Sequence, residues 1–244
     1  MAGPRFEVLE YDELASTNDE ARRLAEEGGR EGLVVRAHSQ TAGRGRQGRR
    51  WVSEEGNLFA SLLLRPEVPL AQAATLPFVA AAALSDTLAP KLRDEAALTH
   101  KWPNDVLLHG RKVSGILLES GGSRQGLYVV VGIGVNVTSF PQETLYPATS
   151  LKEAGIEWEA GALLTSYITV FSNLYQLWLA HGFGPLRKAW LRRAAHLGKP
   201  VEIGHGDDKQ AGIFEDVDET GALLLRSADG NLKTITAGDV FLVD

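Results

Sequence analysis

The sequence contains no cysteine among its 244 residues. This absence excludes disulfide bonds, thiolate metal sites and a cysteine nucleophile, and it is consistent with a cytoplasmic protein. The sequence also lacks an apolar run of about 18 residues, the length that would predict a transmembrane helix. Residues 1–10 lack the basic and apolar pattern of a secretory signal. We therefore expect a cytoplasmic protein with no membrane partner.

Positive charge is scarce as well. The chain has 25 Lys and Arg against 31 Asp and Glu, a formal net charge of −6. This balance argues against general nucleic-acid binding, which usually requires broad positive charge. The stretch "GRGRQGRRW" (43–51) is a local exception, with the arginines Arg44, Arg46, Arg49 and Arg50.

The arginine loop, defined here as residues 43–50, has the composition of an anion site. A guanidinium matches carboxylate or phosphate oxygens two at a time, and glycine lets backbone N–H groups approach such a ligand closely. Three glycines and four like charges make ordering the loop costly, so we expect it to become ordered when an anion binds. Two other interpretations stay open here, a solvated surface loop and an RNA-binding Arg/Gly segment.

The apolar patterns predict an α+β chain. Two neighbouring turns, His109-Gly110 and 121–126, favour an antiparallel meander near the middle of the chain. Thr17 and Glu20 match a capping box, and Pro77 marks the start of a helix or a kink within it. Strands are expected at 5–11, 32–40, 57–65, 98–109, 112–120 and 127–137, and helices at 16–29, 70–92, 159–181 and 185–197.

The pattern changes after Gly198. Only short strands with Gly and Asp turns follow, which is typical of a small β-barrel. We therefore expect two domains, residues 1–197 and residues 198–244.

Two motifs lie in the predicted meander. In "KWPND" (101–105), Pro103 keeps Trp102 out of the helical region, so a turn projects Asn104 and Asp105. In "KVSGILLE" (112–119), Lys112 opens a strand that Gly115 interrupts, a sign of close ligand approach. Taken alone, an ordinary turn explains the first motif and a β-bulge explains the second.

Two further motifs are ambiguous on the same terms. In "GIGVNV" (132–137), a glycine stripe leaves space for a flat molecule, or for tight packing against a helix. "STN" (16–18) supplies hydroxyls at a helix N-terminus, where they either cap the helix or bind a polar head group.

In this order, the motifs resemble the catalytic and C-terminal domains of biotin protein ligases. The resemblance rests on "STN", "QTAGRGRQGRRW" (40–51), "KWPND", "KVSGILLE", "GIGVNV" and "GALLLRSADG" (221–230). It implies a central mixed or antiparallel sheet packed with helices, the class II synthetase-like biotin–lipoate ligase fold, plus a small C-terminal SH3-like β-barrel. The implied activity is ATP-dependent: biotin and ATP give biotinyl-5′-AMP, and a lysine of a biotin carboxyl carrier domain then receives biotin.

The resemblance also implies roles for individual residues. Lys112 and Arg46 would be catalytic, and Asp105 would help to hold Mg²⁺. Biotin would contact Ser16, Thr17, Asn18, Gln40, Gly43, Arg44, Gly45, Arg46, Lys112, Gly115 and Gly132. The nucleotide would contact Arg46, Trp51, Asn104, Asp105, Lys112 and Asn136.

The sequence departs from the family pattern in two places. "STN" begins at residue 16, so no DNA-binding domain is expected before it, and Gln47 stands where the loop commonly has arginine. The resemblance leaves a homodimer possible. A lipoate–protein ligase of the same fold and a non-enzymatic nucleotide or RNA binder remain as alternatives, whereas an octanoyltransferase with a cysteine nucleophile is excluded.

Overall fold

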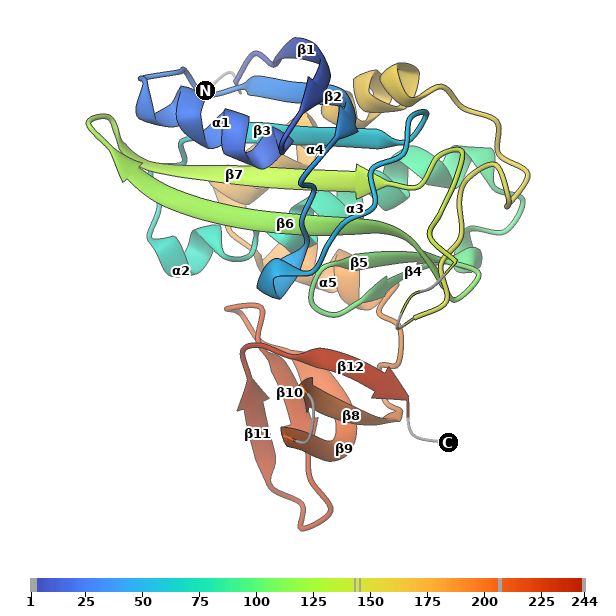
Figure 1. The fold of residues 1–244 in the computed structure, drawn as a ribbon. Helices are drawn as coiled ribbons and strands as arrows, with labels where there is room; N and C mark the ends of the chain where they lie inside the picture. Colours follow the sequence, from blue (N-terminus) through green and yellow to red (C-terminus); the bar gives the residue numbers. More distant parts are fainter. Residues whose placement is uncertain (1–3, 143, 145, 206–207, 243–244) are drawn as a thin grey trace.

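Two sheets organise the chain in the computed structural model, which describes residues 4–142, 144, 146–205 and 208–242. The larger sheet has seven strands in the order β1-β2-β3-β7-β6-β5-β4, and the smaller has five in the order β11-β10-β9-β8-β12. Figure 1 shows the small sheet as a separate C-terminal body beside the β4–β5 end of the large one. The limits of the two expected domains at residues 1 and 244 lie outside the described residues.

The elements follow one another from an N-terminal α/β region to an all-β end. The large sheet contains β1 (Glu7–Leu14), β2 (Leu33–Gln40), β3 (Leu58–Leu64), β4 (Leu98–Lys101), β5 (Asp105–Leu108), β6 (Arg111–Ser123) and β7 (Gly126–Val135). The helices are α1 (Thr17–Glu26), α2 (Leu70–Ala73), α3 (Leu76–Leu88), α4 (Ala160–His181) and α5 (Gly184–Leu191), with short 3₁₀ turns η1 (Arg46–Gly48), η2 (Ala89–Lys91) and η3 (Glu95–Ala97). The small sheet contains β8 (Pro200–His205), β9 (Asp208–Val217), β10 (Leu223–Arg226), β11 (Leu232–Ile235) and β12 (Asp239–Leu242).

The large sheet is mixed, one of the two arrangements that the resemblance implies. β1 pairs with β2 in parallel, and the other neighbours pair antiparallel. The meander from β4 to β7 is confirmed, and its turn at His109 and Gly110 has φ angles of 51° and 72°. The expected strand 98–109 is broken at residues 102–104, which separates β4 from β5 as "KWPND" predicts.

Several sequence predictions need correction. The capping box is wrong, because Ser16 is the N-cap of α1 and makes no side-chain capping bond. The Glu20 carboxylate instead accepts from Tyr11 and Arg23. The helix 185–197 ends early, at Leu191, and the turn 121–126 is shorter than expected because β6 runs to Ser123 and β7 starts at Gly126.

The expected helix 70–92 is two helices, and Pro77 lies in the first turn of α3, which begins at Leu76. The stretch Leu70–Lys91 is long and apolar enough to cross a membrane by composition alone. In the fold, 78% of an 18-residue window within this stretch is buried. The helices α3 and α4 cover one face of the large sheet (Figure 1). The apolar composition of the stretch is therefore accounted for by the protein core.

The alternation of side chains along β3 and β7 positions the functional cavity. One face of each strand, including Leu62 and Val131, packs in the main core beneath α3 and α4. At one end of the opposite face, Leu63 and Val130 pack under α1. At the other end of that face, Phe59 of β3 and Gly132 and Gly134 of β7 form the floor of the cavity described below.

Buried His100 gives a test of the core through pH. Its Nε2 lies 2.8 Å from Ser85 Oγ and its ring stacks on Trp190, and burial lowers the pKa of His100 to about 4. The unfolded chain binds a proton near pH 6.5, so the folded protein is favoured above that pH and loses this contribution as the pH falls toward 4.

We expect the free energy of unfolding to fall by up to roughly 3 kcal/mol through His100 over this window. Urea unfolding at pH 7.5, 5.5 and 4.5 should show a smaller pH dependence for His100→Gln than for the parent. Equal pH dependence in the two proteins would contradict the assignment to His100.

Candidate active site

A cavity of about 360 Å³ lies over the end of the large sheet that carries Phe59, Gly132 and Gly134. Its volume is in the size range of small-molecule sites. It brings together all the residues that the sequence analysis assigned to a site, except Gly43. Gly43 is buried beside the cavity, where a Cβ atom would lie 2.5 Å from Ser53 Oγ and 2.9 Å from the Trp51 carbonyl oxygen. Gly43 therefore acts by permitting close packing of the arginine loop.

One end of the cavity, called here the polar end, consists of Ser16, Thr17, Asn18 and Gln40. The Gln40 Oε1 atom accepts from the Thr17 backbone N–H at 2.8 Å and from Thr17 Oγ1 at 3.1 Å. Gln40 thus caps the N-terminus of α1 from a neighbouring strand, in place of the expected capping box. Ser16 and Thr17 are 4% and 5% exposed, and both line the cavity. A polar head group seated there would meet hydroxyls and a helix N-terminus.

A β-bulge brings Lys112 into the cavity. In the pairing of β5 with β6, Val106 faces Ser114 and Leu107 faces Lys112, so Val113 is the extra residue. Strict alternation would place Lys112 and Gly115 on opposite faces, because they are three residues apart. With the bulge they share a face, and a Cβ atom on Gly115 would lie 3.3 Å from Lys112 Nζ.

The backbone of Lys112 is fixed on both sides. Its N–H donates to the Pro147 carbonyl at 2.8 Å, and its carbonyl accepts from the Thr149 N–H at 2.9 Å. Asn136, 3% exposed, donates from Nδ2 to the Thr149 carbonyl at 3.0 Å. Asn136 therefore holds the segment that flanks Lys112, in addition to lining the cavity.

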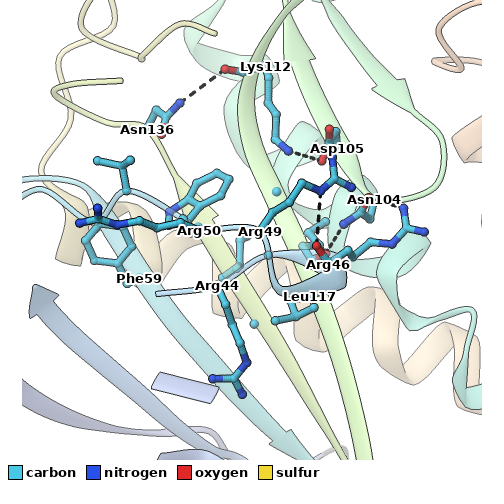
Figure 2. Close-up of a pocket in the computed structure, with 18 of the residues that line it drawn as sticks. Arg44, Arg46, Arg49, Arg50, Phe59, Asn104, Asp105, Lys112, Leu117 and Asn136 are labelled. Carbon is cyan, nitrogen blue, oxygen red and sulfur yellow. Dashed lines mark hydrogen bonds and ion pairs between the residues drawn. The ribbon is translucent and has the colours of Figure 1, made fainter. Parts of the chain in front are cut away.

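The Lys112 ammonium group lies 2.7 Å from Asp105 Oδ1, and Figure 2 shows the two side chains pointing toward each other. Asp105 is mostly enclosed, with 12% of its side chain exposed. Asn104, its neighbour, accepts from Arg46 Nη1 at 3.4 Å. The cation and the carboxylate are therefore preorganised at one place in the cavity.

The arginine loop is held by protein carboxylates, which differs from the expectation that a bound anion alone would offset its charge. Arg44 pairs with Asp19, and Arg49 Nη2 lies 3.0 Å from Asp239 Oδ1. Arg46 and Arg50 have no ion pair among the described residues, and Arg46 differs from Arg44 and Arg49 in its partners. Arg46 donates to the neutral oxygens of Asn104 and Gly238, and burial lowers the pKa of its guanidinium.

In the structure, protein side chains lie over the glycines of the cavity floor. They fill the space that the prediction for Gly115 and Gly132 assigned to a ligand. A Cβ atom on Gly132 would lie 2.2 Å from Asn18 Oδ1, so this glycine accommodates a side chain of α1. Cβ atoms on Gly115 and Gly134 would lie 2.9 and 2.6 Å from the Trp51 ring. Trp51 thus lies flat over the floor, with its Nε1 buried and without a hydrogen-bond partner in the described structure.

The sequence analysis missed the contribution of the C-terminal sheet. Asp239 of β12 lines the cavity and reaches the arginine loop, and the Trp102 indole N–H donates to the Gly221 carbonyl at 2.9 Å. Tyr146 also lines the cavity, and its ring lies 2.9 Å from the Nζ of buried Lys101. The pKa of Lys101 is lowered to about 8 by burial. No motif in the tail signals the contacts of Asp239 and Gly221, because these contacts depend on how the two sheets pack.

Among the described residues, five cations and two carboxylates line the cavity: Arg44, Arg46, Arg49, Arg50 and Lys112 against Asp105 and Asp239. Such a site favours an anionic ligand. The cavity thus has the features of a site for a small anionic molecule, with hydrogen-bonding groups at the polar end and a fixed cation at Lys112.

Comparison with known proteins identifies the family. The profile of the biotin/lipoate A/B protein ligase family matches residues 13–136, and that of the biotin protein ligase C terminal domain matches residues 196–243. The biotin–[acetyl-CoA-carboxylase] ligase of Paracoccus denitrificans is 43% identical, over 93% of this chain and 96% of that one. That of Mycobacterium tuberculosis is 33% identical, over 93% and 86%. The biotin protein ligase of Aquifex aeolicus, solved with biotin and ATP, superposes with a TM-score of 0.81 at 31% identity, covering 97% of this chain and 98% of that one. The chain belongs to the biotin/lipoate A/B protein ligase family.

Proposed function

We propose that this chain is a biotin–protein ligase that works in two steps. A carboxylate oxygen of biotin attacks the α-phosphorus of ATP, and pyrophosphate leaves, which gives biotinyl-5′-AMP. The ε-amine of an acceptor lysine then attacks the acyl carbon, loses a proton, and displaces AMP. The similarity to ligases named for biotin supports this function over a lipoate ligase of the same fold.

The observation that carries the proposal is the placement of Lys112 by the bulge in β6. Two anions, the biotin carboxylate and the α-phosphate, must meet in the first step despite their repulsion. A fixed cation between them stabilises the charge that develops in the transition state. Lys112 would have this position; its backbone is held on both sides and its side chain shares the cavity face with Gly115, which supports the assignment.

The other assigned residues fit distinct parts of the two substrates. The polar end, Ser16, Thr17, Asn18 and Gln40, would hold the ureido head of biotin, which needs hydrogen-bond donors and acceptors. Arg46 would receive the phosphate, because it lines the cavity and its guanidinium donates to the neutral oxygens of Asn104 and Gly238. Trp51, Asn104 and Asn136 would contact the nucleotide, with Asn136 also supporting the segment next to Lys112.

Magnesium fits the donor set as a substrate-bound ion. Mg²⁺ is usually held by one or two carboxylates and by substrate phosphates. Asp105 supplies one carboxylate in the cavity, and the described residues contain no cluster of three or more metal-binding side chains that would hold the ion alone. Asp105 would then exchange part of its pairing with Lys112 for the metal.

The acceptor, the assembly and the domain limits belong to the same proposal. The acceptor is a biotin carboxyl carrier domain, the enzyme works in the cytoplasm without DNA or membrane partners, and a homodimer is possible. The division into a catalytic domain, 1–197, and a C-terminal domain, 198–244, is supported by the family match to residues 196–243 and by the start of β8 at Pro200.

A pyrophosphate-release assay tests the function. Biotin and ATP together should release pyrophosphate, and biotin should support the reaction far better than lipoate or octanoate. Pyrophosphate release with lipoate and ATP, but not with biotin and ATP, would favour the lipoate ligase. Binding of ATP or RNA without any pyrophosphate release, with all three acids tested, would favour the non-enzymatic alternative.

A further inference from the structure

Arg44 is held by two carboxylates from different elements. Its two terminal nitrogens donate to both oxygens of Asp19, at 2.7 and 2.6 Å. Nη2 also lies 3.1 Å from each oxygen of Glu119 on β6. Asn18 of the polar end shares the second partner, Glu119: its Nδ2 donates to Glu119 Oε2 at 2.6 Å. One carboxylate thus joins the arginine loop to the polar end.

Glu119 also determines which way the Asn18 amide points. An ionised carboxylate only accepts hydrogen bonds, so it fixes Nδ2 of Asn18 on its own side. The Asn18 Oδ1 atom then faces Ser61 Oγ, at 2.6 Å, and fills the space over Gly132. Asn18 is 4% exposed, so this orientation is enclosed by the protein.

The hydrogen bonds continue from Asn18 to the other end of the arginine loop. Ser61 Oγ lies 2.8 Å from Thr17 Oγ1, and Thr17 bonds to Gln40. Gln40 Nε2 donates to Ser53 Oγ at 3.0 Å, and Ser53 donates to the Trp51 carbonyl at 3.2 Å. The polar end is therefore one hydrogen-bonded chain whose two ends lie at the start of the arginine loop and just after it.

We propose that Glu119 is a positioning residue for the biotin site, because it couples Arg44 of the arginine loop to Asn18 of the polar end. Glu119 does not line the cavity, so it acts through these two side chains and not by touching substrate. Arg44 is then an anchor whose charge is offset within the protein, while Arg46 is left to receive the anion. The inference rests on the proposed biotin ligase function and adds a specific role for a residue outside the cavity.

The test uses two variants of the full chain. Glu119→Gln keeps an acceptor for Asn18 but removes the charge that faces Arg44 and, at 3.9 Å, Arg22, and Glu119→Ala removes the contacts with all three. We expect the KM for biotin in the pyrophosphate-release assay to rise roughly tenfold for Glu119→Gln, which corresponds to about 1.4 kcal/mol. It should rise further for Glu119→Ala. The KM for ATP and the melting temperature should stay close to those of the parent, which a general loss of structure would not allow.

Glu27→Gln is the matched control. Glu27 is the C-cap residue of α1, at the opposite end of the helix from Asp19, and it pairs with Arg23 at 2.6 Å in an exposed position, so its loss should leave the KM for biotin unchanged. In an Arg44→Ala background, Glu119→Gln should add little, because one arm of the coupling is already absent.

Two results would overturn the role of Glu119: an unchanged KM for biotin in both Glu119 variants, or fully additive effects with Arg44→Ala. Failure of the parent protein to release pyrophosphate with biotin would instead refute the proposed function.

Discussion

Lys112→Ala is expected to slow biotinyl-5′-AMP formation by about 10²–10³-fold, the loss seen when one preorganised transition-state donor is removed. The side chain is 26% exposed, and its ammonium group faces Asp105 at 2.7 Å. Removing it would take away the cation that we propose lies between the two reacting anions. Single-turnover pyrophosphate release at saturating biotin and ATP measures this loss directly.

The same substitution leaves Asp105 without its partner, so a modest fall in melting temperature is expected as well. Single-turnover rates measured well below the melting temperature of the variant separate the two effects. The rate should stay low there, because the folded variant still lacks the cation. Full recovery of the rate at low temperature would show that Lys112 acts by maintaining the fold and not in the reaction.

The sequence predicts the fold well where local signals are strong. Alternating apolar residues, the His109-Gly110 turn and Pro103 define the meander from β4 to β7. Short motifs also predict the cavity lining, because they place polar residues and glycines where β2, β6 and β7 and the N-terminus of α1 meet.

The parts that the sequence could not predict depend on tertiary contacts. The bulge at Val113 shifts register by one residue and decides which face Lys112 occupies, yet no local pattern requires it. The capping box at Thr17 has the correct spacing, but Gln40, 23 residues away, supplies the acceptor. Asp239 reaches the arginine loop only because the C-terminal sheet packs against it.

The sequence also could not show which carboxylates pair with the arginines of the loop. Composition shows a cluster of like charges but not the carboxylates that face it, since Asp19 and Glu119 lie on separate elements. In the structure, Arg44 and Arg49 pair with carboxylates, whereas Arg46 and Arg50 line the cavity without an ion pair in the part of the chain that the structure describes. The role proposed for Arg46 rests on this difference.

Arg46→Gly is expected to separate synthesis of biotinyl-5′-AMP from its retention. The adenylate is a mixed anhydride that reacts with exposed lysines, so its retention depends on slow release from the cavity. Removing Arg46 removes one charge-assisted contact with the ligand, worth roughly 1.5–3 kcal/mol. A tenfold faster escape needs only about 1.4 kcal/mol. The variant should therefore still consume ATP while labelling bystander proteins with biotin.

The experiment incubates each protein with biotin, ATP and albumin, and probes albumin for bound biotin. Arg46→Ala should label albumin as well, because the lost guanidinium and not the added glycine is the cause. Gln47→Gly is the control for loop flexibility: Gln47 has a φ of 58°, which glycine adopts without strain, and its replacement removes no charge. The arginine loop remains anchored through Arg44 and Arg49 in all three variants. If Arg46→Gly makes the adenylate but labels albumin no more than the parent does, these two anchors retain the intermediate and Arg46 does not.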